Sequence, residues 1–222
     1  MQLVQPRRWS RPYGLEAVSV LNTDSPKDFT LRFSYPGSFS YQIPTWAERI
    51  DIIAVGGGGE SGGLLVTGSG GSASSWAYKT VIRGVDIPYA TRYLAGVVGT
   101  GGAGAKGFQQ GFGVIDLVGQ YDGYGGANGI KGQDSYIVAS GMTTLTSVGG
   151  AGGRARSTVQ GEALSDLSFN GKNYAGAQVE IGPGNQGNHP GGGGAGGWAG
   201  FHAGGAGGDG QVWIRAYGWS GS

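Results

Sequence analysis

The sequence predicts an all-β protein: a β-sandwich-like domain with interspersed glycine-rich helices of polyproline II type (polyglycine helices) packed as a bundle. Three observations lead to this prediction. The segments between glycine tracts alternate apolar and polar residues, which is typical of strands. The tracts themselves carry glycine at every third position. Finally, 51 of 222 residues are glycine, yet 38% are hydrophobic and only 13% are charged, so the chain has enough apolar surface to fold.

The alternation is clearest in residues 29–33 and 39–43, where every second side chain is aromatic or aliphatic. Each run would therefore have one dry face. Pro36 and Gly37 lie between the two runs and suit the central positions of a type II turn. We therefore expect residues 29–43 to form a β-hairpin.

Six further runs are expected to be strands, because they are rich in Val, Ile, Thr and Tyr, which fit a pleated surface. They are "RIDIIAV" to Val55, "SWAYKTVIR" from Ser75, "TRYLAGVV" to Val98, "DSYIVAS" from Asp134, "TTLTSV" to Val148 and "QVWIRAY" from Gln211. In the last run, Val212, Ile214 and Ala216 share one face. No run predicts a helix, apart from a turn at "TWAE".

Glycine tracts interrupt these strands at several points. "IIAV" runs into "GGGGE", "GVV" into "GTGGAGAKG" and "LTSV" into "GGAGG", and "GGAGGDG" runs into the last strand. A single appended linker would not alternate with strands in this way. The arrangement predicts that the tracts gather at one end of the sheets.

The spacing of the glycines favours ordered tracts. Glycine stands at positions 191, 194, 197 and 200, then at 204, 207 and 210, and also at 123, 126, 129 and 132 and at 101, 104 and 107. The polyproline II conformation repeats every three residues and has no internal hydrogen bonds. Tracts packed side by side can satisfy each other's N–H and C=O groups, provided that the inward position has no side chain.

Large side chains appear where the glycine register slips, at Trp198, Phe201 and His202. We interpret this as a tip where side chains leave the bundle. Aromatic residues beside glycines have few neighbours to bury them, and exposed rings are common in carbohydrate and lipid recognition. The candidate receptor-binding residues are Phe108, Phe112, Tyr121, Tyr124, Trp198, Phe201 and His202.

The first residues have a different composition, which predicts an N-terminal arm over residues 1–28 and a glycine-rich β-domain over residues 29–222. Arg7, Arg8, Trp9 and Arg11 cluster in the arm. We expect them to attach the protein to neighbouring proteins rather than to nucleic acid. A formal net charge of +1 does not supply the concentrated basic surface that phosphate binding needs.

The composition also limits where the protein can be located and which kinds of site it can contain. The chain has no cysteine, which excludes disulfides and thiolate metal sites. No apolar run approaches the ~20 residues of a membrane span, and the first residues lack the apolar core of a secretion signal. We therefore expect a protein that is made in the cytoplasm; if it acts outside a cell, it must leave by another route, for example inside a larger particle.

The motifs give no positive case for catalysis or cofactor binding. G-x-G-x-x-G occurs at residues 57–62 and 99–104, but this glycine content produces it by chance, and no helix is expected to follow. His189, His202 and Asp209 lack the spacing of a metal site. The carboxylates stand singly, without an acid and base pair. We expect no metal, no cofactor and no enzymatic activity.

Several segments in order resemble the glycine-rich minor tail proteins of actinobacteriophages, notably those that infect mycobacteria. They are "YQIPTWAERIDIIAVGGGGE", "VIRGVDIPYATRYLAGVVGTGGAG", "SGMTTLTSVGGAGG", "LSFNGKNYAGAQV" and "PGGGGAGGWAGFHAGGAGGDGQVWIRAY". The resemblance covers roughly Phe39 to Tyr217. It implies a component of the phage tail tip in the virion, used in host attachment, with the cell-envelope glycan or lipid and other tail-tip proteins as partners.

Four functions remain open at this point. The first is a non-enzymatic tail-tip adhesin, and the second is a purely structural tail-tip assembly protein; either could be a homo-oligomer, for example a trimer. An ice-binding protein is the third, because packed glycine helices also occur there, but the broken triplets disfavour a flat repetitive face. A cell-wall hydrolase is the enzymatic alternative, and it would need an essential carboxylate.

Overall fold

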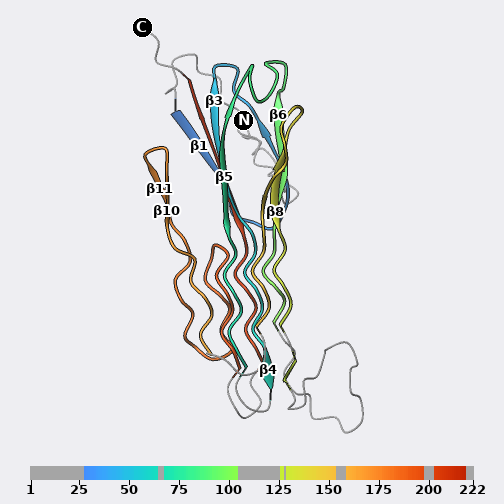
Figure 1. The fold of residues 1–222 in the computed structure, drawn as a ribbon, viewed down its shortest axis with the longest axis vertical. Coiled ribbons are helices and arrows are strands. Elements are labelled where there is room, and N and C mark those ends of the chain that lie inside the picture. Colours follow the sequence, from blue (N-terminus) through green and yellow to red (C-terminus); the bar gives the residue numbers. More distant parts are fainter. Residues whose placement is uncertain are drawn as a thin grey trace, which may run out of the picture.

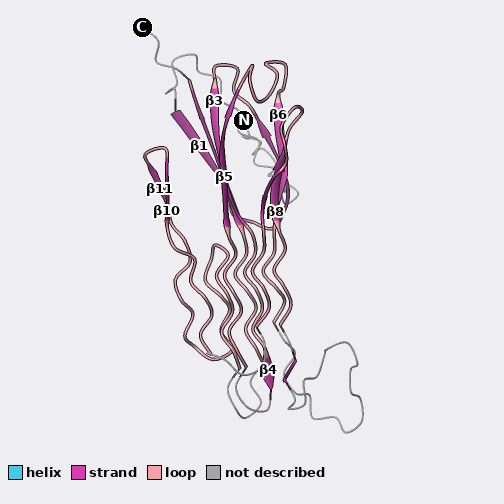
Figure 2. Cartoon of the chain, in the orientation of Figure 1, coloured by secondary structure: helices cyan, strands magenta, loops and turns pink. Residues whose placement is uncertain are grey.

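The computed structural model of the chain describes residues 28–64, 68–104, 126–127, 129–153, 159–197 and 203–218. Within these ranges the regular elements are β-strands, and all of the paired strands run antiparallel. The longer strands gather at one end of an elongated molecule, and glycine-rich segments run side by side towards the other end (Figure 1). Figure 2 shows that these segments lie outside the regular strands.

The first sheet has four strands in the order β1-β12-β3-β5. They are β1 (Asp28–Phe33), β12 (Gln211–Tyr217), β3 (Arg49–Val55) and β5 (Trp76–Ile82). Val212, Ile214 and Ala216 of β12 are fully buried, which confirms the face predicted for this strand. The second sheet has the order β2-β6-β8-β9, with β2 (Gly37–Gln42), β6 (Tyr93–Val98), β8 (Ser135–Val138) and β9 (Leu145–Ser147).

The predicted hairpin over residues 29–43 is wrong. β1 pairs with β12 and β2 pairs with β6, so the two runs belong to different sheets. Their dry faces point at the same core from opposite sides, and the rings of Phe33 and Phe39 stack 4.2 Å apart. Pro36 and Gly37 carry the chain from one sheet to the other, with Gly37 at a φ of 125°. Two neighbouring strands with one apolar face each can form a hairpin, but they can equally belong to two sheets that face each other. The alternating pattern is the same in both cases.

One apolar cluster joins the two sheets. It contains Ile50, Ile52, Val212 and Ile214 from the first sheet and Tyr41, Leu94, Val98 and Ile137 from the second. Burial of each such side chain contributes about 1.5–3 kcal/mol relative to exposure. This cluster therefore holds the two sheets face to face.

A short hairpin covers the outer face of the first sheet. It consists of β10 (Leu167–Phe169) and β11 (Lys172–Tyr174), joined at Asn170 and Gly171, both of which have positive φ angles. Phe169 packs on Tyr78 with ring centroids 4.8 Å apart, and Tyr174 packs edge-on against Trp213 at 5.5 Å. The remaining strands, β4 (Gly63–Leu64) and β7 (Gly126–Ala127), pair with each other near the other end of the molecule (Figure 1).

The segment 56–62 lies at the centre of the glycine-rich bundle. Its N–H groups donate in turn to three other segments: Gly57 to Gln133, Gly58 to Gly208 and Gly59 to Ser72, each at 2.8 Å. The same three segments recur in the same order one triplet later, as Glu60 donates to Ile130, Ser61 to Gly205 and Gly62 to Ser69. The hydrogen bonds of this segment therefore repeat every three residues.

The carbonyl groups of the same segment accept from three further segments. Gly57 accepts from Gly150, Gly58 from Gly102 and Gly59 from Gly194, and the series continues with Glu60 accepting from Gly153 and Gly62 from Gly197. Segment 56–62 is thus hydrogen-bonded to six surrounding segments. Nearly every main-chain polar group of this buried stretch has a partner, as burial requires.

Glycine is needed in the bundle for space. A Cβ atom built on Gly57, Gly58 or Gly59 would overlap the main-chain carbonyl of Thr100, Gly192 or Ala151, respectively. Left-handed φ angles are absent from Gly56 to Gly59, so conformation alone would tolerate other residues there. The close approach of neighbouring backbones therefore explains why glycine occupies these positions.

Candidate functional site

The predicted site residues lie outside the described part of the chain. The seven candidate receptor-binding residues fall within residues 105–125 and 198–202, and the four attachment residues fall within residues 1–27. The structure does place the residues that flank the first seven. They belong to segments 99–104, 126–127, 129–134, 191–197 and 203–210 of the bundle.

These flanking segments end close together. Gly207 donates its N–H to the carbonyl of Gly102 at 3.0 Å, and a Cβ at Gly104 would lie 3.0 Å from the carbonyl oxygen of Gly204. We define the distal end as the end of the bundle remote from the two four-stranded sheets (Figure 1). It comprises the ends of the described segments that contact one another beside β4: Leu64, Gly68, Gly104, Gly126, Gly153, Val159, Gly197 and Ala203. Both stretches with candidate binding residues thus leave the described chain at the distal end.

Three carboxylates complete the hydrogen bonding of the bundle. Glu60 Oε2 accepts the N–H of Ile130 at 2.8 Å, Asp209 Oδ1 accepts that of Gly101 at 2.9 Å, and Asp134 Oδ1 accepts that of Gly149 at 2.9 Å. Each carboxylate takes a main-chain donor from a neighbouring segment. These side chains fix the alignment of segments that have few side chains of their own.

Glu60 differs from the other two because it is buried in the middle of the bundle. Burial raises the pKa of its carboxyl above the ordinary value of 4.5, and the hydrogen bond from Ile130 opposes that rise. A carboxyl with a raised pKa costs stability once it ionises in the folded state. Stability therefore falls as the pH rises from 4.5 through the raised pKa.

Replacing Glu60 by glutamine is expected to raise the free energy of unfolding at pH 7.5, because the amide still accepts from Ile130 without a buried charge. The gain should shrink as the pH falls towards 4.5. Thermal unfolding of both proteins across this range measures it. Glu162→Gln is the matched control, since Glu162 is exposed and also accepts a main-chain N–H, from Ala73. A loss of stability in Glu60→Gln at every pH would contradict the expectation.

Two buried serines join the sheets to the bundle. Ser135 Oγ donates to the carbonyl of Val55 at 2.7 Å and accepts the N–H of Gly99 at 2.9 Å. Ser147 Oγ likewise donates to the carbonyl of Ser75 and accepts the N–H of Gly56, both at 2.6 Å. Each hydroxyl links the end of a strand to the beginning of a glycine segment. The orientation of the bundle is therefore tied to the sheets.

A buried arginine organises the opposite end of the sheets. The Arg83 guanidinium donates from Nη1 to the carbonyls of Pro44, Thr45 and Ala47, at 3.1 to 3.3 Å, and from Nη2 to that of Tyr89. These carbonyls belong to two loops remote from the bundle. Arg83 therefore holds these loops together at the end of the domain opposite the distal end.

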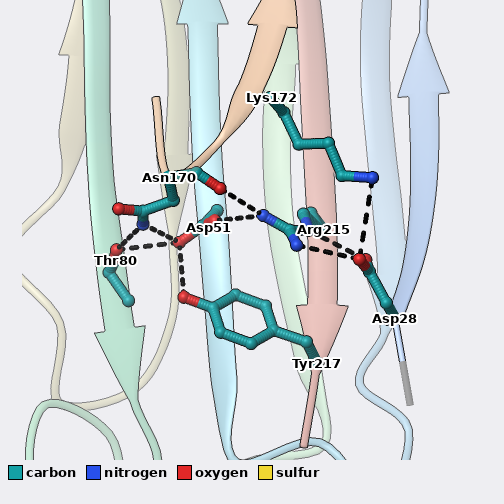
Figure 3. Close-up of polar contacts among 7 residues, drawn as sticks. All are labelled: Asp28, Asp51, Thr80, Asn170, Lys172, Arg215 and Tyr217. Carbon is teal, nitrogen blue, oxygen red and sulfur yellow. Dashed lines mark hydrogen bonds and ion pairs between the residues drawn. The ribbon is translucent and has the colours of Figure 1, made fainter. Parts of the chain in front are cut away.

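Asp51 is the centre of a polar network under the β10–β11 hairpin (Figure 3). It is fully buried in β3, and its Oδ1 accepts from Thr80 Oγ1 at 2.8 Å, from Asn170 Nδ2 at 2.9 Å and from the Tyr217 hydroxyl at 3.1 Å. Its Oδ2 lies 3.5 Å from Arg215 Nη1. The network connects three strands of the first sheet to the turn of the hairpin.

Arg215 extends this network to the first strand. Its Nε and Nη2 donate to the two carboxylate oxygens of Asp28 at 2.8 Å, and its Nη1 donates to the carbonyl of Asn170 at 2.9 Å. The hydrogen bond from Arg215 lowers the pKa of Asp28 below 3.8. The stabilisation from this pair is present above pH 3.8 and is lost as the pH falls through the lowered pKa.

This hairpin and its network were not predicted from the sequence. The dipeptide Asn170-Gly171 between "LSF" and "KNY" is the signal that could have revealed it, because Asn-Gly favours the tight turn of a two-residue hairpin. The role of Asp51 had no comparable signal. It depends on the alignment of Thr80, Asp51 and Arg215 across three strands.

The residues that the structure describes hold neither a metal-ligating cluster nor a membrane-spanning helix. They contain no group of three or more His, Cys, Asp or Glu residues arranged to hold a metal ion. His189, one of the two histidines, contacts Gln211 Oε1 through its Nε2. Nor does any helix in the described ranges have the length and apolarity to cross a membrane. The principal feature is a bundle that carries chain segments to one end.

Comparison with known families finds a match to the glycine-rich domain over residues 33–217, which is most of the chain. The chain belongs to this glycine-rich domain family. The glycine-rich protein is similar to the Gene 32 protein of Mycobacterium phage D29, with 38% identity over 192 residues, covering 82% of this chain and 80% of the relative. It is also similar to the Gene 32 protein of Mycobacterium phage L5, with 37% identity over 190 residues, covering 83% and 80%.

These relatives give the glycine-rich protein a phage context. The family match includes both four-stranded sheets except for most of β1, and it also spans the described bundle. The similarity to mycobacteriophage proteins agrees with the resemblance seen in the sequence at the level of a phage glycine-rich protein.

Proposed function

We propose that the protein is a non-enzymatic minor tail protein at the phage tail tip, and that it binds the host cell envelope through the distal end of its bundle. The actinobacterial envelope, through a glycan or a lipid, is the partner on one side. Other tail-tip proteins are the partners on the other side. The protein would thus be located in the virion after synthesis in the host cytoplasm.

The observation that carries this proposal is the polarity of the molecule. Asp28 and Tyr217 pair with each other at the end of the first sheet that is remote from the bundle. The arm therefore joins the domain there, with Arg7, Arg8, Trp9 and Arg11 as candidates for attachment. The stretches with the candidate binding residues leave at the other end. An adhesin needs this separation between a fixed end and a presented end.

The bundle accounts for the length and stiffness of the connection. We propose that its segments are polyglycine helices of polyproline II type, and that the two sheets form a β-sandwich above them. Support comes from the three-residue repeat of the hydrogen bonds around segment 56–62. The conformation has three residues per turn, so successive N–H groups point to successive neighbours. Such a support holds exposed loops at a fixed distance from the sheets.

Recognition would depend on the side chains presented at the distal end. Phe108, Phe112, Tyr121 and Tyr124 belong to one presented stretch. Trp198, Phe201 and His202 belong to the other. Aromatic rings can stack on sugars or enter lipid, and one such site would have modest affinity. Several copies on one particle would raise the overall affinity through avidity.

The double substitution Trp198→Ala with Phe201→Ala is expected to reduce saturable binding of labelled protein to actinobacterial cells at least about tenfold, because paired aromatic residues often dominate an interface. The measurement is a binding isotherm on intact cells, with phage as competitor and an enterobacterial strain as negative control. Ala175→Ser, on the exposed hairpin side of the sheets, is the matched control.

Assembly separates adhesion from a purely structural role. Particles that contain the double variant should assemble normally but adsorb poorly. Failure to assemble would favour the structural tail-tip protein instead. Wild-type protein that is folded and multimerised but does not bind the cells would also contradict the adhesin.

A further inference from the structure

The outer face of the second sheet has an unusual composition. Its outward positions alternate with buried positions along β2, β6, β8 and β9, and none of them carries a formal charge. Three of its large side chains remain exposed: Tyr93 by 56%, Tyr136 by 39% and Val138 by 38%. We call this surface the β6 face, and it consists of Ser38, Ser40, Gln42, Tyr93, Ala95, Val97, Tyr136, Val138 and Thr146.

The outer face of the first sheet provides the contrast. It carries Asp28, Arg32, Arg49, Asp51 and Arg215 at outward positions, and the β10–β11 hairpin packs on it. No described segment covers the β6 face in the same way. An antiparallel sheet with a face towards water normally presents polar and charged residues there. The β6 face has polar residues but no charged ones, and its exposed Tyr93, Tyr136 and Val138 form the kind of surface that can meet another protein.

The size of the outward side chains differs from strand to strand across the β6 face. One row across the sheet is Ser40, Ala95 and Val138, in the order β2, β6, β8. The next row is Ser38, Val97 and Tyr136 in the same order. In these two rows the side chain is therefore small on β2 and large on β8, whereas Gln42 and Tyr93 form a row of larger side chains at one end of the face.

We propose that the β6 face binds the β6 face of a second copy of this chain, with both copies pointing in the same direction. A two-fold axis parallel to β6 places β2 of one copy over β8 of the other. Ser40 then faces Val138 of the partner and Ser38 faces its Tyr136, while Ala95 faces its own counterpart. Small residues therefore meet large ones between β2 and β8, while Tyr93, Ala95 and Val97 of β6 lie along the axis and each face their own counterpart, as in a self-complementary two-fold interface.

The absence of charge and the sizes of the side chains both favour a second copy of this chain as the partner of the β6 face. An uncharged face loses no solvation of ionised groups against an uncharged partner, whereas a charged partner would have to bury its own charges. A two-fold axis perpendicular to the strands would instead place β2 over β2 and leave small residues opposite small residues. The parallel arrangement is therefore the better packed one.

The parallel arrangement has a consequence for attachment, which rests on the proposed function. Two distal ends would face the same surface, side by side. Binding of one would raise the effective concentration of the other at that surface. The self-association itself requires no receptor, so it is tested independently of adhesion.

Sedimentation equilibrium of the full-length protein tests the proposal. The wild type should dimerise reversibly. Ala95→Arg should weaken dimerisation about a hundredfold, because the substitution brings two like charges together at the axis. Ala175→Arg, the same substitution on the hairpin side, should have no effect. A folded wild type that stays monomeric up to millimolar concentration, or a folded Ala95→Arg variant that dimerises like the wild type, would overturn the proposal.

Cross-linking provides a second readout that does not depend on a charge in the interface. The chain has no cysteine, so Ala95→Cys creates a single thiol at the proposed axis. A short bismaleimide should link two copies of this variant at low protein concentration but should not link Ala175→Cys. Equal yields for the two variants would contradict the assigned face.

Discussion

Substituting Gly58 by alanine is expected to lower the free energy of unfolding by at least about 4 kcal/mol, at the upper end of the effects of single substitutions. Gly58 lies in the central segment, and its new Cβ would overlap the carbonyl of Gly192 and lie 3.0 Å from that of Gly191. Neither obstacle is a flexible side chain. The backbone of segment 191–197 would have to move, and its hydrogen bonds to segments 68–75 and 56–62 would be lost with it.

Chemical denaturation of wild type and variant measures this effect. Gly104→Ala is the matched control, because Gly104 is exposed at the distal end and its new Cβ would come no closer than 3.0 Å to the Gly204 carbonyl oxygen and 3.3 Å to the Ala206 nitrogen, whereas a Cβ at Gly58 would overlap the Gly192 carbonyl oxygen. That variant should stay within about 1 kcal/mol of the wild type, since alanine also restricts the unfolded chain. Equal stability of the two variants would mean that the segments are not packed as the structure shows.

Replacing Asp51 by alanine is the second change with a large expected effect, a loss of about 3–5 kcal/mol. The substitution leaves Thr80, Asn170 and Tyr217 without their buried acceptor and removes one of the two carboxylates beside Arg215. The turn of the β10–β11 hairpin would then keep its hydrogen bonds from Arg215 to the Asn170 carbonyl and from Asn170 to Thr80, but would lose the one to the buried carboxylate. Thermal unfolding and proteolysis within residues 167–174 measure the loss.

Lys172→Ala is the matched control for this network. Lys172 contributes an exposed ion pair with Asp28, with an N–O distance of 3.7 Å. Exposed pairs contribute about 0–1 kcal/mol, so this variant should behave nearly as the wild type. If Lys172→Ala lost as much stability as Asp51→Ala, the hairpin would be held through Asp28 rather than through Asp51.

The strands could be predicted from the sequence because their apolar positions alternate. The run "QVWIRAY" shows this best, since its two faces are assigned correctly from the pattern alone. Partner choice could not be predicted in the same way. The segments 29–33 and 39–43 satisfy the pattern of a hairpin, but their apolar faces meet across the core from two sheets.

The glycine spacing carried more information than the glycine content. Glycines 191, 194 and 197 accept hydrogen bonds from Ser74, Gly71 and Gly68, so the three-residue spacing seen in the sequence is the spacing of contacts with one neighbour. Which segments become neighbours could not be read from the sequence, because the contacts join main-chain atoms that every residue has. The buried Glu60 and Asp51 were missed for a related reason, since their partners come from distant strands and segments.

Protection of single cysteines on binding to cells tests most directly whether the distal end meets the host. Ala103→Cys places an exposed thiol next to the distal end, and Ala90→Cys places one in a loop at the opposite end of the sheets. Binding to actinobacterial cells should slow maleimide labelling of Ala103→Cys and leave Ala90→Cys unchanged. Protection of Ala90→Cys alone would show that the protein meets the cell with its other end and would contradict the proposed orientation.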